Sequence, residues 1–211
     1  MMTYAYDKDM MLSARQNMAV MIDYAVTWCG LPLRSFYNRW LGSRIPEVFA
    51  AGHPKFTLGM SGIELAARVM ENTGGTLLPD DTYSYPQSDP SYFWTGWAVC
   101  QYQWYKNKSF ASLDKNGLSI ERIHSMFNPL HEADITKVFE VFDSLYHPTP
   151  ITLKEQRKLN GLTQQELSEA SGVSLRMIRA YEQGTQDMSK AEASSLLRLA
   201  NVLHCAPETL V

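Results

Sequence analysis

The protein has 211 residues, of which 45% are hydrophobic and 19% are charged, and its formal net charge at pH 7 is −3. This composition favours one large or two small folded domains and excludes a wholly disordered chain. The negative net charge gives no support for nucleic-acid binding. Such binding would instead depend on where the charged residues lie on the surface.

The three cysteines, Cys29, Cys100 and Cys205, are widely spaced and form no C-x-x-C pair. Neither a zinc site nor a disulfide framework is therefore predicted, and isolated cysteines are typical of reducing compartments. The N-terminus lacks the basic start and apolar run of a secretory signal, and no apolar run approaches the roughly 20 residues that span a bilayer. We expect a cytoplasmic protein without a membrane segment.

Helices are predicted throughout the first two thirds of the chain. The apolar residues from Met11 to Trp28 recur at close to the 3.6-residue period of a helix. Ser61 and Glu64 form a capping box that opens another helix. The expected helices cover residues 11–28, 33–41, 46–51, 62–71, 90–106, 120–126 and 132–145, with a loop over 77–89. The alternation of strands and helices that an α/β domain requires is absent, so an all-α fold is predicted.

The helix over residues 90–106 holds seven aromatic residues, which permit two interpretations. Aromatic residues at helical spacing are more often part of a core, which would bury this helix on several sides. Alternatively, they form a partner-binding surface or a ligand pocket. The candidate residues for that second role are Tyr92, Trp94, Trp97 and Trp104.

Patterns typical of catalysis are weak in this half of the chain. The string from His131 to Asp134 resembles part of a metal-ligand motif but lacks a second histidine four residues along the helix. No glycine-rich phosphate loop and no G-x-S-x-G motif occur. We expect no enzymatic activity, no metal and no cofactor.

A domain boundary is predicted at the segment Tyr146-His147-Pro148-Thr149-Pro150. Two prolines within three residues end a helix and favour an extended linker. We divide the chain into residues 1–147, a linker of residues 148–150 and a second domain of residues 151–211. Seven basic residues balance seven acidic ones in this second domain.

The second domain is predicted to consist of short helices with clear ends. They cover residues 152–160, 164–170, 175–183 and 189–203, and a last turn begins at Ala206-Pro207. Capping boxes are expected at Thr163–Glu166 and at Ser189–Glu192, and Ser174 is expected to cap the third helix. Gly161, Gly172 and Gly184 mark the ends of the first three helices.

The second and third of these helices form a corner. Two helices of about eight residues joined by a three- to four-residue turn are held near a right angle. Five residues are expected to meet inside the corner, namely Leu167, Ala170, Val173, Ile178 and Tyr181. Four are left facing outward, namely Leu175, Arg176, Arg179 and Ala180. An arginine can reach O6 and N7 of guanine together, so the third helix is predicted to read a major groove.

The second domain contains LKEQRKLNGLTQQELSEASGVSLRMIRAYEQG followed by SKAEASSLLRLANVLHCAPETL. These residues resemble the Cro/repressor-like helix-turn-helix family, often called the XRE family. The resemblance implies a five-helix domain that binds operator DNA, usually as a dimer. Matched by position, it implies base-facing places for Ser174, Leu175, Arg176 and Ala180. Arg179 lies between them, where it can reach phosphate or a base edge. The resemblance also implies a phosphate contact for Gln164 and a structural ion pair between Arg157 and Glu182.

Several features bear on how such a domain would hold DNA. Leu175 and Ala180 are apolar where many members of the family have Gln, Asn or Lys, so hydrogen-bond readout rests mainly on Arg176. Further contacts to the DNA backbone are expected from Gln183, Gln186 and Lys190, because amide and ammonium donors commonly hold phosphates. One copy carries few cations, and a homodimer would double the contacts.

The whole chain also resembles a group of two-part bacterial regulators, some from toxin–antitoxin-like operons. The resemblance is carried by KFTLGMSGIELAARV, SYFWTGWAVCQYQWYKNKSFASL and LHEADITKVFEVFDS. It implies an antitoxin-like protein whose second domain binds double-stranded DNA at its own promoter, while residues 1–147 hold a cognate toxin, another protein partner or a second subunit. Two alternatives stay open for residues 1–147: a small-molecule sensor, and an enzyme fused to its own regulator.

Overall fold

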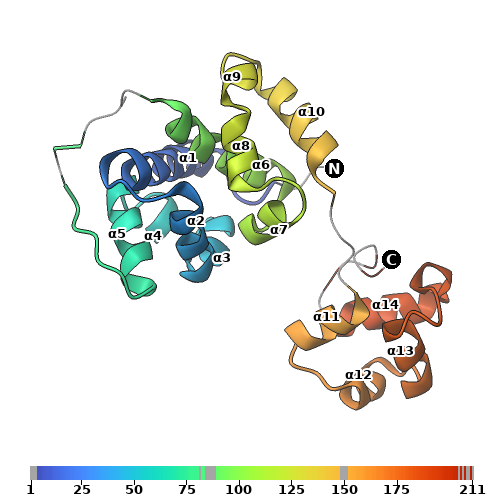
Figure 1. Ribbon diagram of the computed structural model, residues 1–211. Coiled ribbons are helices and arrows are strands. Elements are labelled where there is room, and N and C mark those ends of the chain that lie inside the picture. The colour runs from blue at the N-terminus through green and yellow to red at the C-terminus, as the bar shows by residue number, and fades with distance from the viewer. Residues whose placement is uncertain are drawn as a thin grey trace. The chain divides into compact units, whose positions relative to one another are not determined.

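The structure, a computed structural model, describes residues 4–80, 82–83, 89–147, 152–203, 205, 207 and 210. The chain splits into two compact units, Met1–Pro148 and Thr149–Val211 (Figure 1). Each unit has its own apolar core. All regular structure of the described residues is helical, which confirms the predicted all-α fold. None of the described helices has the length and apolar character needed to cross a membrane.

The N-terminal unit is built from helices of very different lengths. In chain order they are α1 (Lys8–Asp23), the π-helix η1 (Tyr24–Trp28), α2 (Leu33–Gly42), α3 (Ile45–Ala50), α4 (Pro54–Thr57), α5 (Gly62–Asn72), α6 (Ser91–Lys106), α7 (Phe110–Lys115), α8 (Ile120–Ser125), α9 (Phe127–Leu130) and α10 (Ile135–Leu145). The long predicted helices are present, and the Ser61–Glu64 capping box is confirmed. The short helices α4, α7 and α9 were not predicted.

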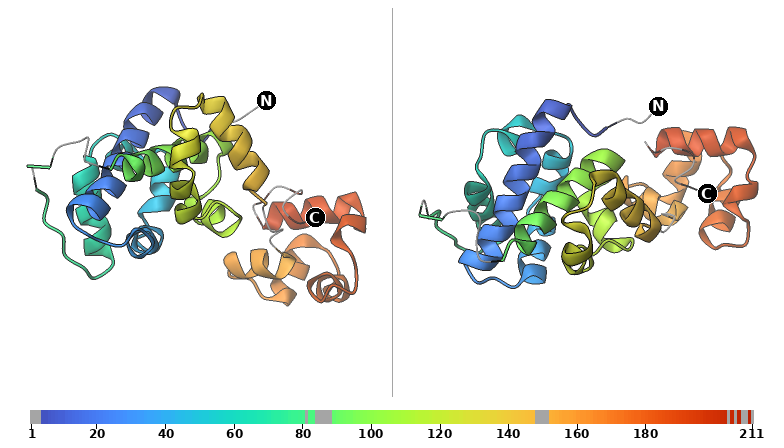
Figure 2. Two further views of the ribbon diagram at one scale, coloured as in Figure 1. Left: turned by 45° about the horizontal axis from the view of Figure 1, so that its top comes forward. Right: turned by 90° about the horizontal axis from the view of Figure 1, so that it is seen from above.

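The longest helices, α1 and α6, pack along each other through the middle of this unit (Figure 2). Gly96 of α6 makes their close approach possible. A Cβ atom added there would lie 2.5 Å from the carbonyl oxygen of Met18 and 2.8 Å from Cα of Ala19. Gly62 does the same for α5, because its Cβ would lie 2.5 Å from Val20. Two glycines thus let α1 contact a helix on each side.

The aromatic helix α6 is buried on several sides, as the first interpretation of its sequence predicts. Trp104 is 5% exposed and donates its indole N–H to the carbonyl oxygen of Tyr6 (2.7 Å). Trp94 is 9% exposed, while Tyr92 and Trp97 are half-buried against the core. None of these four candidates is the exposed aromatic anchor that a partner surface would use.

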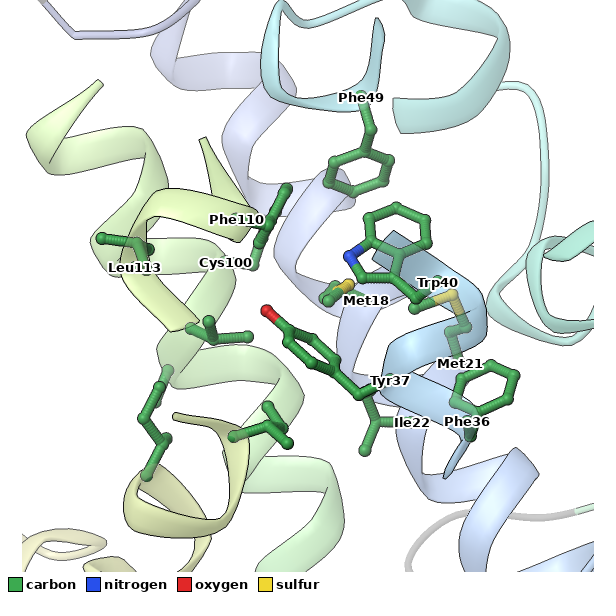
Figure 3. Packing of buried hydrophobic residues seen from close by; sticks show 14 of the residues in the cluster. Met18, Met21, Ile22, Phe36, Tyr37, Trp40, Phe49, Cys100, Phe110 and Leu113 are labelled. Carbon is green, nitrogen blue, oxygen red and sulfur yellow. The ribbon is translucent and has the colours of Figure 1, made fainter. Parts of the chain in front are cut away.

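Aromatic rings also fill the core between α2, α3 and α7. The ring centroid of Trp40 lies 5.5 Å from that of Phe49 and 5.5 Å from that of Phe110, both nearly edge to face. Figure 3 shows these rings beside Met18, Met21 and Ile22 of α1. Such pairs add about 0.5–1.5 kcal/mol each beyond the area that they bury.

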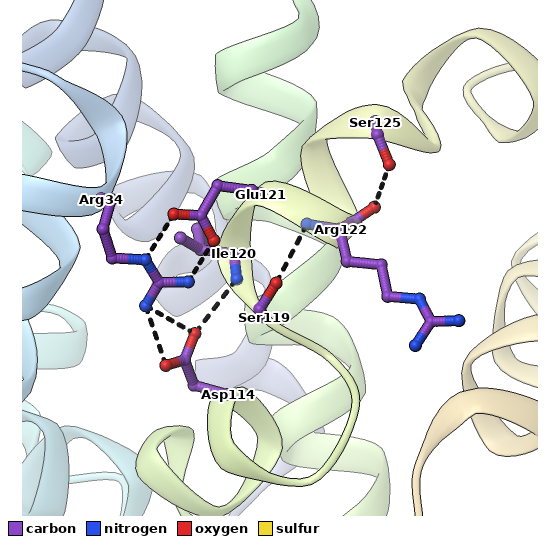
Figure 4. A network of polar contacts seen from close by, with 7 residues as sticks. All are labelled: Arg34, Asp114, Ser119, Ile120, Glu121, Arg122 and Ser125. Atoms are coloured by element: carbon purple, nitrogen blue, oxygen red, sulfur yellow. Dashed lines mark hydrogen bonds and ion pairs between the residues drawn. The ribbon is translucent and has the colours of Figure 1, made fainter.

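A charged network fastens α2 to the short helices α7 and α8 (Figure 4). The guanidinium of Arg34 forms an ion pair with Asp114 (2.8 Å) and another with Glu121. Asp114 also accepts the backbone N–H of Ile120 (3.1 Å), which opens α8. The hydrogen bonds from Arg34 lower the pKa of Glu121, so this carboxylate is ionised at neutral pH.

The C-terminal unit has five described helical segments. They are α11 (Leu153–Leu159), α12 (Gln164–Ser171), α13 (Leu175–Glu182), the 3-10 helix η2 (Met188–Lys190) and α14 (Ala193–Val202). Its core is made by Leu153, Leu167, Val173, Ile178, Leu199, Ala200, Leu203 and Leu210. The last turn predicted from Ala206 lies largely outside the described residues.

The caps of these helices agree with prediction at Thr163 and Ser174 and differ at Thr152 and Ser189. The Thr163–Glu166 capping box is confirmed, and Thr152 forms a second box that was not predicted. The capping box predicted at Ser189 is wrong. The N–H of Ser189 instead donates to the carboxylate of Asp187 (3.0 Å), which opens η2, and α14 begins only after Glu192. An aspartate two residues upstream competes for the same backbone region and decides the local structure.

Candidate nucleic-acid interface

The turn between α12 and α13 is three residues long, from Gly172 to Ser174. Gly172 adopts φ +66°, a conformation that glycine reaches without a Cβ penalty, and its N–H donates to the carbonyl oxygen of Ser168 (2.9 Å). The hydroxyl of Ser168 reaches across the turn to the carbonyl oxygen of Val173 (2.7 Å). Ser174 then caps α13 by accepting the N–H of Met177 (3.3 Å). The turn therefore sets a fixed direction for α13.

The inner side of the corner is apolar and largely as predicted. Leu167 and Ile178 are fully buried, Val173 is 4% exposed, and Tyr181 packs against them. The predicted place of Ala170 is wrong, because this residue is exposed. On α12 the inner face is defined by Leu167 and Ser171, four residues apart, and Ala170 falls beside it.

The outer side of α13 presents two cations. Arg176 and Arg179 are exposed, and within the described part of the chain neither side chain forms a hydrogen bond or an ion pair. Ser174 is exposed beside them, while Leu175 and Ala180 are half-buried. The structure thus gathers the predicted base-facing residues on one outward surface of a rigidly held helix.

An ion pair behind α13 fixes its far end. Nε of Arg157 lies 2.6 Å from Oε1 of Glu182, and Nη2 lies 3.0 Å from Oε2. The amide of Gln164 also donates to Oε2 of Glu182 (2.7 Å). One carboxylate, 2% exposed, therefore ties together α11, α12 and α13. Burial raises the pKa of Glu182, but the hydrogen bonds from Arg157 and Gln164 outweigh burial and hold this pKa below its usual value.

This arrangement of a buried corner, a fixed turn and an outward cationic helix has a counterpart among known families. Residues 153–210 match the helix-turn-helix family. No curated protein and no solved structure matches the chain. The match covers the C-terminal unit alone, and it supports a DNA-binding transcriptional regulator.

The predicted backbone contacts of the helix-turn-helix unit fall into two groups. Gln183, Gln186 and Lys190 are exposed after the end of α13, and Nζ of Lys190 lies 4.0 Å from a carboxylate oxygen of Asp187. Gln164 is half-buried and already donates one amide N–H to Glu182. Sequence reasoning missed that bond, because neither periodicity nor capping determines where a glutamine amide points.

The aromatic candidates of the N-terminal unit are not brought together in one place. Trp94 and Trp97 line one groove, whereas Trp104 lines another with Tyr4 and Tyr105. Tyr92 stacks on His124, with ring centroids 4.4 Å apart. In the described residues, no three His, Cys, Asp or Glu side chains are grouped so that they could hold a metal ion.

Proposed function

We propose that this protein is a sequence-specific transcriptional regulator in which α13 enters the major groove of operator DNA. The proposal is carried by the exposure of Arg176 and Arg179, which have no partner among the described residues, on a helix whose other side packs into a buried corner. A guanidinium in this place can bond guanine bidentately, and the half-buried Leu175 and Ala180 fit contacts with thymine methyl groups.

A homodimer is the assembly that this function requires. The helix-turn-helix unit carries seven basic and seven acidic residues, so one copy has too few net cations for tight binding to phosphates. Two copies would double the contacts and present two α13 helices to half-sites about one helical turn apart. We take the operator to lie in the promoter of the protein's own operon, with Gln183, Gln186 and Lys190 on the DNA backbone.

The proposed base readout is tested by a gel-shift titration against that promoter. Arg176→Ala should cost about 1–3 kcal/mol of binding free energy and relax the preference at one base pair in each half-site. Arg68→Ala, which removes an exposed arginine of α5 in the N-terminal unit, is the matched control and should leave the affinity unchanged. Equal weakening of all DNA sequences by Arg176→Ala would contradict the role given to this residue.

A backbone contact should behave differently from a base contact. Lys190→Ala should weaken binding uniformly across sequences and reduce the slope of log affinity against log salt by about 1. Gln164→Ala should also weaken binding with little change in preference, but it removes a bond to Glu182 as well, so Lys190 is the cleaner test. A change in sequence preference in Lys190→Ala would contradict the proposed contact between Lys190 and the DNA backbone.

The antitoxin-like role belongs to the same proposal and concerns the N-terminal unit. In it, residues 1–147 hold a protein encoded beside this chain, such as a cognate toxin. Because Trp94 and Trp104 are buried, the exposed apolar residues Trp28 (42%) and Leu78 (79%) are better candidates for contacts with such a partner. Co-purification of the full chain with its operon neighbour should succeed and should be weakened by Leu78→Asp. The absence of a complex with the wild-type chain would contradict the role.

A second function, small-molecule sensing, is favoured by one observation. The groove that contains Trp94 and Trp97 has a volume of about 340 Å³, within the range of about 300–1,000 Å³ typical of ligand sites. The N-terminal unit would then bind a ligand that controls the regulator.

A further inference from the structure

The groove formed by the end of α6, by α10 and by the segment before α1 is rich in aromatic rings. Four of its seven lining residues are aromatic, namely Tyr4, Trp104, Tyr105 and Phe139. The rings of Tyr4 and Trp104 stack with centroids 4.1 Å apart, and those of Tyr105 and Phe139 stack at 4.2 Å. The centroids of Tyr4 and Tyr105 are 6.5 Å apart. A cation can therefore lie within about 6 Å of both, the range in which ring faces attract cations.

Backbone hydrogen bonds hold Tyr4 in this place. The N–H of Ala5 donates to the carbonyl oxygen of Trp104 (3.2 Å), and the indole N–H of Trp104 donates to the carbonyl oxygen of Tyr6 (2.7 Å). The ring of Tyr4 lies parallel to that of Trp104, within 2°, and yet Tyr4 stays 46% exposed. The segment before α1 thus adds to the groove an aromatic ring that is open to solvent.

The side of the groove formed by α10 carries two carboxylates, and no lining residue is basic. Glu140 and Asp143 both line the groove, and their spacing of three residues makes them neighbours on one helix face. Like charges at this spacing repel, and a cation in the groove would relieve that repulsion. Lys137 pairs with Glu140 (3.0 Å), but the two side chains are 63% and 68% exposed, so water screens this pair.

One cation of the chain itself is held by the same kinds of group. Nζ of Lys106 lies 5.2 Å from the centroid of the Tyr105 ring and 2.8 Å from Oδ1 of Asp143. A ring face and a carboxylate therefore hold an ammonium together at this groove. Lys106 neutralises one of the two carboxylates, and Glu140 can accept a second cation in exchange for its exposed lysine.

The two other grooves described on the same unit lack this combination. The groove along α5 has Arg68 beside Glu64 and Glu71, and the groove at Trp94 has no carboxylate in its wall. The volume of the groove at Tyr4 is about 420 Å³, within the range of about 300–1,000 Å³ typical of ligand sites. Ring faces, carboxylates and a wall without basic residues all favour an organic cation.

We propose that the groove at Tyr4 binds a small organic cation with a quaternary ammonium group. The ammonium lies against the rings of Tyr4 and Tyr105, with Glu140 as its counter-charge. A quaternary ammonium suits this wall because its methyl groups pack on ring faces and it has no N–H that needs an acceptor. The proposal depends neither on DNA binding nor on the groove at Trp94, so its failure would leave both of those functions standing.

The test is calorimetric titration of the full chain, at constant ionic strength, with choline and with its uncharged carbon isostere 3,3-dimethylbutan-1-ol. Choline should bind saturably and at least about tenfold more tightly than the isostere, because only the charged probe gains from the ring faces and the carboxylates. Equal binding of the two probes would overturn the assignment of a cation. The absence of choline binding would overturn the proposal as a whole.

Variants of two charged residues locate the cation. Glu140→Gln should weaken choline binding about fivefold and leave the isostere unchanged, whereas Glu132→Gln, a side chain 89% exposed and outside the groove lining, should change neither. Lys106→Gln removes a neighbouring positive charge and should strengthen choline binding about threefold. Tryptophan fluorescence checks that each variant is folded. Wild-type choline affinity in Glu140→Gln, or no gain in Lys106→Gln, would overturn the proposed place of the ligand.

Discussion

At the scale of single residues, Glu182 joins three helices of the helix-turn-helix unit. Its buried carboxylate accepts hydrogen bonds from Arg157 and Gln164, and removing one partner of such a pair leaves an uncompensated charge inside the protein. We expect Glu182→Gln to destabilise the unit by about 3–5 kcal/mol. Amide hydrogen exchange on peptides from residues 152–203 measures this unit apart from the other.

The control for that measurement is Lys190→Ala. The Lys190 ammonium is exposed and only 4.0 Å from Asp187, so its loss should change stability by less than about 0.5 kcal/mol. A Glu182→Gln chain as stable as the control would mean that the ion pair contributes little.

The same carboxylate should make the unit less stable in acid. Burial raises the pKa of Glu182, but hydrogen bonds from Arg157 and Gln164 lower it further, so the folded state binds this proton more weakly than the unfolded chain does. The stabilisation is complete above the unfolded value of about 4.3 and is lost as the pH falls through the folded pKa. Between pH 5 and pH 3, exchange-derived stability should fall more steeply in the wild-type chain than in Glu182→Gln. Parallel slopes in the two proteins would refute this linkage.

How far residue roles follow from the sequence depends on the kind of contact. The resemblance implied a pairing of Arg157 with Glu182, and the two side chains lie in bidentate contact. The bond from Gln164 to Glu182 was not expected, and neither was the exposure of Ala170. A helical pattern gives the direction of a residue to within about one position, which is too coarse to decide either of them.

At the scale of helices, the packing of α1 on α6 depends on Gly96. A methyl group there would meet the backbone of Met18 and Ala19, neither of which can move aside without separating the two helices. Gly96→Ala should destabilise the N-terminal unit by about 1–3 kcal/mol, measured by urea unfolding with tryptophan fluorescence. Gly42→Ala is the control, because a Cβ atom added at Gly42 would have no atom within 4 Å beyond its own helix backbone and chain neighbours. This variant should leave the free energy of unfolding unchanged or slightly raised. A Gly96→Ala chain that unfolds at the wild-type urea concentration would show that α1 and α6 do not meet as closely as described.

The helices that the sequence predicts correctly are those with a long periodic pattern of apolar residues or with a capping box at the N-terminus. The helices α5 and α6, and α1 taken together with η1, have long periodic patterns or a capping box, and their predicted bounds lie within a few residues of the observed ones. The helices α4 and α9 have four residues each and contain a proline, so no period is long enough to detect. These short segments are helical because the surrounding core holds them, which is tertiary information.

At the scale of the whole molecule, two separate cores predict two unfolding events. All five tryptophans, residues 28, 40, 94, 97 and 104, lie in the N-terminal unit, so their fluorescence reports that unit alone. Gly96→Ala should shift the fluorescence transition without changing hydrogen exchange in residues 152–203, and Glu182→Gln should do the reverse. If either variant shifts both signals, the units fold as one cooperative block.

The two units also differ in how much of their function the sequence reveals. The helix-turn-helix unit is specified by turn residues and caps at fixed spacing, so its fold and outward residues follow from short-range rules. The N-terminal unit is specified by long-range packing. From the sequence, the aromatic residues of α6 form one candidate surface. In the structure, Trp104 is buried, and Trp94 and Trp97 line a groove.

The proposed entry of α13 into a major groove is tested by methylation interference on the promoter DNA. Methylation of guanine N7 blocks the major-groove edge that an arginine would contact. We expect interference at guanines in two half-sites about one helical turn apart, and loss of interference at one guanine per half-site in Arg176→Ala. Binding that N7 methylation does not affect, or an interference pattern unchanged by Arg176→Ala, would contradict it.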